Sequence, residues 1–93
     1  MVTRKITLDE LRDQQFPSYD VLTTFQERYE REHKLRSAMA LTNGQHEPVW
    51  IIIKLASGEN AEVYSNLIDL EDTHVELHGG FGIPITAIYD VGV

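Results

Sequence analysis

The run Val49–Leu55, VWIIIKL, restricts the possible folds of this chain more than any other segment. Its β-branched and aromatic residues favour a β-strand over a helix. Successive side chains of a strand point to opposite faces, so Trp50 and Ile52 share one face while the valine and the other two isoleucines share the other. Both faces are therefore apolar. We expect one of them to pack on a helix and the other to fill the inside of a small barrel.

Four further strands are predicted after this run, each bounded by turn-forming residues. They cover residues 61–68, 73–78, 83–85 and 88–91. Polar and apolar residues alternate between positions 73 and 78, which predicts that Val75 and Leu77 point inward and that the opposite face is wet. The glycine-rich segment 79–82 predicts a hairpin turn, and Pro84 predicts an edge position.

Two helices are predicted before the strands. The segment Thr7–Glu10 has the spacing of a capping box, which predicts a helix over about residues 8–15. Ser18 or Asp20 is predicted to cap a second helix. The apolar side chains along one side of that helix are Tyr19, Leu22, Phe25, Tyr29 and Met39. This stripe either packs on the sheet or contacts a second subunit. Packing is favoured, because a small sheet needs another element to cover its apolar face.

One domain is expected, because 93 residues cannot fill two separate cores. The predicted fold class is α+β, with N-terminal helices packed on a small five-stranded antiparallel sheet that bends into a partial barrel. We expect the helical segment over residues 1–41, a polar connector over 42–48 and the barrel over 49–93. The longest apolar stretch, Val49–Ile53, is far shorter than the roughly 20 residues that cross a bilayer. No signal-peptide pattern precedes it, so a cytoplasmic protein is expected.

The excess negative charge lies in the C-terminal part of the chain. Residues 1–36 carry equal numbers of basic and acidic side chains, whereas residues 37–93 carry a single base, Lys54, and the whole net charge of −7. Such a surface repels a phosphate backbone, so nucleic acid is not an expected partner, and it suits a basic protein surface. The predicted partner-binding residues are Glu59, Glu62, Asp69, Glu71, Asp72, Glu76 and Phe81.

Catalytic and metal-binding patterns are sparse. The absence of cysteine excludes disulfides, thiolate metal sites and cysteine nucleophiles. His74, Glu76 and His78 share one strand face and are the metal candidates, but the two histidines lie about 13 Å apart at the rise of a strand. One ion therefore reaches only neighbouring pairs, and a third ligand such as His46 or Asp72 has to come from elsewhere. We expect no cofactor, no metal and no catalytic residues.

The turn and core residues of the C-terminal half form a recognisable series. They are Val49–Leu55, Ser57–Glu59, Ala61–Asp69, Thr73–Leu77 and Ile83–Ile88. This series, over about residues 48–91, resembles an SH3-type barrel of the Sm-like kind and, within it, the YolD-like family of small bacterial proteins. The resemblance implies a non-enzymatic accessory protein linked to error-prone DNA repair polymerases. Asp72–His74 and Gly82–Pro84 do not match the base-contacting pattern of RNA-binding Sm proteins, so no RNA pocket is carried over.

The predicted function is that of a non-enzymatic acidic interaction or regulatory module that binds a basic protein surface. We expect it to be a monomer or a small homo-oligomer without a membrane partner. One alternative is a Sm-like ring that binds nucleic acid through bases on the second predicted helix, which are Arg28, Arg31, Lys34 and Arg36. The other alternative is a metal-dependent enzyme or metal-binding protein that uses His74, Glu76 and His78.

Overall fold

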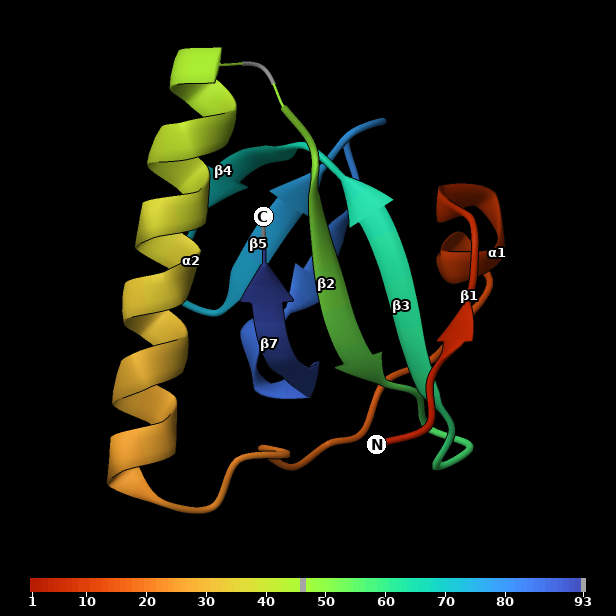
Figure 1. Ribbon diagram of the computed structural model, residues 1–93. Helices are drawn as coiled ribbons and strands as arrows, with labels where there is room; N and C mark the ends of the chain where they lie inside the picture. The colour runs from red at the N-terminus through yellow and green to blue at the C-terminus, as the bar shows by residue number, and fades with distance from the viewer. Residues whose placement is uncertain (46, 93) are drawn as a thin grey trace.

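The computed structural model describes residues 1–45 and 47–92, and within these the side chains of 43–45 are left out of the description. The elements, in chain order, are β1 (Arg4–Lys5), α1 (Leu8–Arg12), α2 (Phe25–Gln45), β2 (Val49–Lys54), β3 (Asn60–Ser65), β4 (Leu67–Leu70), β5 (His74–Leu77), β6 (Gly82–Pro84), the 3₁₀ helix η1 (Ile85–Ala87) and β7 (Ile88–Gly92). Figure 1 shows α2 standing beside two packed sheets. The α+β class is therefore confirmed.

The strands form two sheets. Sheet A has the order β1-β3-β2-β7, in which β1 runs parallel to β3 and the other pairs are antiparallel, and sheet B has the antiparallel order β4-β5-β6. The predicted strand 61–68 is divided at Asn66, so that β3 belongs to sheet A and β4 to sheet B. The prediction of a single five-stranded sheet is wrong. The described residues form seven strands, and their two sheets do not join into a closed barrel.

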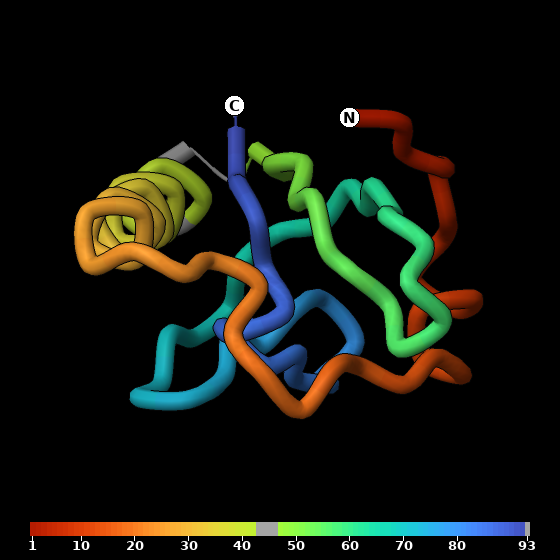
Figure 2. The backbone as a smooth tube through the Cα atoms, turned by 90° about the horizontal axis from the view of Figure 1, so that it is seen from below, coloured from red at the N-terminus to blue at the C-terminus, as the bar shows by residue number. Residues whose placement is uncertain are grey.

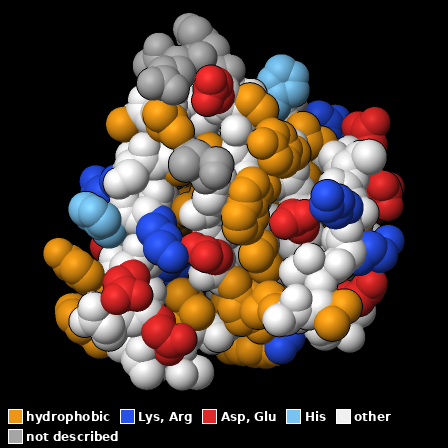
Figure 3. Space-filling view, viewed as in Figure 1, with side chains coloured by type: hydrophobic (Ala, Val, Ile, Leu, Met, Phe, Trp, Pro, Cys, Tyr) orange, Lys and Arg blue, Asp and Glu red, His pale blue; other side chains and the backbone are white. Residues whose placement is uncertain are grey.

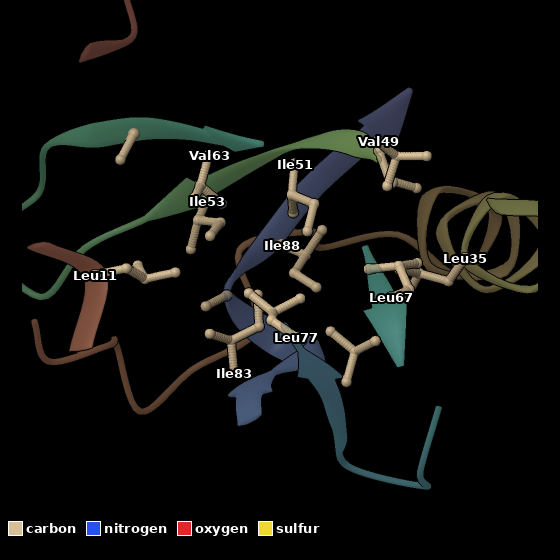
Figure 4. Packing of buried hydrophobic residues seen from close by; sticks show 14 of the residues in the cluster. Leu11, Leu35, Val49, Ile51, Ile53, Val63, Leu67, Leu77, Ile83 and Ile88 are labelled. Atoms are coloured by element: carbon tan, nitrogen blue, oxygen red, sulfur yellow. The ribbon is translucent and has the colours of Figure 1, made fainter. Parts of the chain in front are cut away.

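The core lies between the two sheets. The inward face of β2, with Ile51 and Ile53 fully buried, meets buried residues of sheet B such as Leu77 and Ile83. Figure 4 shows these side chains pointing toward one another, with Leu11 and Leu35 closing the core from the two helices. The predicted inward orientation of Val75 and Leu77 is confirmed, because both are fully buried.

Helix α1 is capped as predicted. The Thr7 side chain accepts a hydrogen bond from the Glu10 N–H, and the Glu10 carboxylate accepts one from the Thr7 N–H. The helix ends at Arg12, short of the predicted end near Gln15. Strand β1 precedes it and pairs with β3, so the chain does not begin with helices.

Helix α2 begins later and ends later than predicted. A second capping box forms between Thr24 and Glu27, whose backbone N–H groups donate to each other's side chains. Asp20 instead accepts a hydrogen bond from the Leu22 N–H outside the helix. The helix continues to Gln45, into the segment predicted as a connector over 42–48. None of the described helices is long and apolar enough to cross a membrane.

The face that α2 buries is also different from the predicted one. Arg31, Leu35, Ala38 and Thr42 recur at intervals of about one helical turn and are buried against β4 and β7. Within the predicted stripe, Tyr19, Phe25 and Tyr29 are exposed, whereas Leu22 is buried and Met39 is half-buried against the core. Figure 2 shows α2 at the flank of the sheets beside β7, which leaves the outer face of β2 and β3 uncovered. The expectation that a helix covers the second apolar face of β2 is therefore wrong.

Candidate functional site

The structure divides the acidic residues predicted to bind a partner between the two sheets. Glu59, in the loop before β3, forms an exposed ion pair with Arg4, with 2.8 Å between Arg4 Nε and Glu59 Oε2. Glu62 is half-buried on the outer face of sheet A, in a hollow that Lys5 also lines. The remaining four residues, Asp69, Glu71, Asp72 and Glu76, lie on the β4–β5 hairpin. We call these four residues the acidic hairpin.

The acidic hairpin brings like charges together. Asp69 lies directly opposite Glu76 in the strand register, because the register shifts between Leu67 and Asp69. Glu71 and Asp72 stand in the connecting turn, which a hydrogen bond from the Glu71 N–H to the His74 carbonyl closes at 2.8 Å. Directly opposed like charges destabilise a sheet pair. Within residues 1–45 and 47–92, none of the four carboxylates takes part in an ion pair.

A cleft of about 300 Å³ separates the turn of this hairpin from α2. Its lining is Arg28, Arg31, Glu32, Leu35 and Arg36 from α2, with Leu70, Glu71, Asp72 and Ile85 from the opposite side. The bases on the helix side already have acidic partners: Arg36 pairs with Glu32 at 2.9 Å, and Arg28 and Arg31 both pair with Asp20. The opposite wall carries Glu71 and Asp72 without such partners among the described residues.

Asp20 and Arg31 form the most buried ion pair. Two parallel hydrogen bonds of 2.7 and 2.8 Å join the guanidinium to the carboxylate, and Arg31 Nη1 also donates to the Ile88 carbonyl. Burial alone would raise the pKa of Asp20. Hydrogen bonds from Arg31 and the Leu22 N–H, together with the charges of Arg31 and Arg28, outweigh burial, so the pKa of Asp20 lies below its ordinary value. The pair ties the segment before α2 to the helix and to β7.

The bases predicted to bind nucleic acid are compensated in the same way. Arg28 and Arg31 pair with Asp20, Arg36 pairs with Glu32, and Lys34 Nζ lies 2.9 Å from Asp90 Oδ1 on β7. Helix α2 therefore does not present a row of uncompensated positive charge. This arrangement weakens the nucleic-acid hypothesis, because counterion release at phosphates depends on accessible cations.

The metal candidates lie along β5 and just beyond it. His74 and His78 are exposed, Glu76 is half-buried, and Nδ1 of His74 lies 2.8 Å from the Thr73 hydroxyl. The part of the chain that the structure describes contains no group of three or more histidine, aspartate or glutamate side chains that could hold a metal ion. His46, the possible third ligand, lies outside the described residues.

Phe81 is not presented at an exposed turn tip. It is half-buried and packs against the core, and the Arg12 guanidinium lies 5.3 Å from its ring centroid. The turn itself forms as predicted, because Gly79 and Gly80 adopt positive φ values of 92° and 82°. Phe81 therefore has a packing role in this structure and does not belong to the acidic hairpin.

The outer face of sheet A was missed as a candidate surface. Trp50 and Ile52 are half-buried there and Tyr64 is 61% exposed, and we call these three residues the aromatic face. Figure 3 shows hydrophobic side chains gathered over the middle of this side of the molecule, with basic and acidic side chains on both flanks. The alternation in VWIIIKL contained the signal, but the sequence pattern does not show which apolar face remains open.

The Sm-like and YolD-like resemblance stays a prediction. Its residue series includes Trp50, Tyr64, Asp69 and Glu76 but assigns them no binding role. Comparison with family models, with curated proteins and with solved structures gives no match to this chain.

Proposed function

We propose that this protein is a non-enzymatic interaction module that binds a basic protein surface through the acidic hairpin. The observation that carries the proposal is the register pairing of Asp69 with Glu76 beside Glu71 and Asp72, with no ion pair to any of the four among the described residues. A cationic partner relieves their mutual repulsion and gains Coulomb attraction at the same time.

The cleft beside the hairpin supports a lysine or arginine side chain as the recognised group. Leu70 and Ile85 are partly buried side chains on its lining and offer an apolar surface to an aliphatic stem. Glu71 and Asp72 line the same cleft and suit a charged head group. Long basic side chains commonly bury their stems in this way while the charge stays at the surface.

The Sm-like, SH3-type relationship is part of this proposal and rests on the residue series over about residues 48–91. A YolD-like relationship would make the basic partner a component of DNA repair. The fold does not determine the function, so the proposal rests on the hairpin itself.

The test compares two variants that lose the same number of negative charges. The hairpin variant combines Asp69→Asn, Glu71→Gln, Asp72→Asn and Glu76→Gln. The control variant combines Asp9→Asn, Asp13→Asn, Glu30→Gln and Glu47→Gln, which are exposed positions outside the hairpin. Binding of a fluorescent arginine-rich peptide is measured by anisotropy at low ionic strength, with circular dichroism to verify folding.

We expect the hairpin variant to lose about tenfold or more in affinity and the control variant to lose much less. Equal losses in the two variants would contradict the proposal, because binding would then follow net charge and not this surface. If the unmodified chain does not bind the arginine-rich peptide either, the proposal is contradicted as well.

A further inference from the structure

The aromatic face is built on three neighbouring strands. Trp50 on β2 lies opposite Tyr64 on β3 and opposite Gly92 on β7. A methyl group at position 92 would fall 2.7 Å from the Trp50 indole, so the ring lies close over the backbone of β7 because residue 92 has no side chain. The indole is therefore held along the sheet and forms part of the apolar surface of this face.

A protruding group and a hollow lie side by side on this face. Tyr64 is 61% exposed. It borders a hollow of about 410 Å³ that is also lined by Lys5, Ile6, Trp50 and Glu62. A protrusion next to a recess on one surface suits a two-fold symmetric contact, because each copy supplies both halves.

The charges on this face are balanced, in contrast to those of the acidic hairpin. With a net charge of −7, two copies repel each other at most orientations. Lys5 lies beside Glu62 in the register of β1 and β3, and Lys34 pairs with Asp90 on β7. Two copies can therefore meet here without the repulsion that the acidic hairpin would cause.

Hydrogen bonds along β7 hinder strand pairing between the β7 edges of two copies. Arg31 donates to the outward Ile88 carbonyl, and the Val91 N–H donates to Asp90 Oδ1, which also accepts from Lys34. These contacts satisfy edge groups that an added strand would need. A ring built through the β7 edge is therefore disfavoured, whereas the outer face of sheet A is open to a second copy.

We propose that a second copy of this chain binds to the aromatic face, with the two outer faces of sheet A in contact and each Tyr64 in the hollow of the other copy. The acidic hairpin lies on sheet B, so the dimer leaves it open and presents it twice. This inference is independent of the proposed function, because it uses different residues on a different sheet.

The experiment measures mass in solution by sedimentation over a wide concentration range, together with tryptophan emission. Trp50 is the chain's single tryptophan, so its emission reports on this face. The test variant is Tyr64→Lys. The control is Phe25→Lys, which places the same charge at another exposed aromatic residue, 82% exposed, at the start of α2. Circular dichroism verifies that both variants fold.

We expect the unmodified chain and the Phe25→Lys variant to form dimers with a blue-shifted Trp50 emission as concentration rises. The Tyr64→Lys variant should dissociate at least about tenfold more readily, because a central aromatic contact is replaced by a charge. A monomer at every concentration would overturn the proposal and leave the face to a different partner. A dimer that Tyr64→Lys does not weaken, or whose Trp50 emission does not change, would overturn it too.

Discussion

Asp20 and Arg31 form a bidentate ion pair in which the Arg31 side chain is 6% exposed and the Asp20 side chain 14% exposed. The pair joins three parts of the chain, since Arg31 also donates to the Ile88 carbonyl on β7. Arg31 is a charged residue in the middle of the buried face of α2. Its burial is tolerated because Asp20 and the carbonyl satisfy most of its donors.

Replacing Asp20 with Asn should therefore destabilise the fold. The change leaves the Arg31 charge buried without its counter-charge, at a cost of about 2 kcal/mol, somewhat below the range for a fully buried pair. Urea unfolding followed by circular dichroism measures the loss. The matched control is Glu32→Gln, which breaks the exposed pair with Arg36 and should cost under about 0.5 kcal/mol. Equal costs would show that the Asp20 pair is not structural.

The contribution of Asp20 should also depend on pH in a defined direction. Its pKa is lowered in the folded chain, so the unfolded chain binds a proton first as pH falls. The stabilisation is present above the unfolded pKa of about 3.9 and is lost as pH falls through the lower folded value. The difference in unfolding free energy between the unmodified chain and Asp20→Asn should shrink below about pH 4. A difference that stays constant from neutral pH to pH 3 would contradict this.

The start of α2 can be tested at two threonines and a serine. Thr24→Ala removes the side-chain acceptor for the Glu27 N–H and should cost about 1 kcal/mol. Thr23→Ala, one residue away on an exposed side chain, and Ser18→Ala, at the cap expected from the sequence, should each change stability by a few tenths of that. Thermal unfolding of the three variants provides the comparison. A larger loss of stability from Ser18→Ala than from Thr24→Ala would contradict a helix start at Thr24 and indicate that the helix begins at the position predicted from the sequence.

Repulsion between Asp69 and Glu76 should lower the stability of the acidic hairpin. Asp69→Lys converts the like-charge pair with Glu76 into an opposite-charge pair and should stabilise the fold by about 0.5 kcal/mol at low salt. High salt should reduce the gain, because Asp69 is exposed and Glu76 is only half-buried, so ions in solution screen the pair. Asp9→Lys serves as a control for net charge alone, since Asp9 is exposed on α1. An equal gain in stability from Asp9→Lys would show that the reduced net charge, and not the pairing of residues 69 and 76, is the cause.

Features that depend on near neighbours were predictable. The capping box at Thr7 and Glu10, the inward Val75 and Leu77 and the turn at Gly79 and Gly80 all appear as expected. Each of them depends on the backbone preferences and side-chain spacing of a few consecutive residues. The clustering of acidic residues in the C-terminal part could also be seen in the sequence. It placed the four residues of the acidic hairpin among the predicted partner-binding residues.

The candidate surfaces themselves depended on long-range contacts. The register shift beyond Leu67 places Asp69 opposite Glu76, and the position of α2 decides that Trp50 and Tyr64 stay uncovered. The burial of Arg31 requires Asp20 and β7, which no local pattern brings to it. Short stretches of sequence were enough to predict the capping box, the faces of single strands and the overall charge. Which side chains are neutralised and which face is open follows from the folded chain, because strand register and burial are set by partners distant in the sequence.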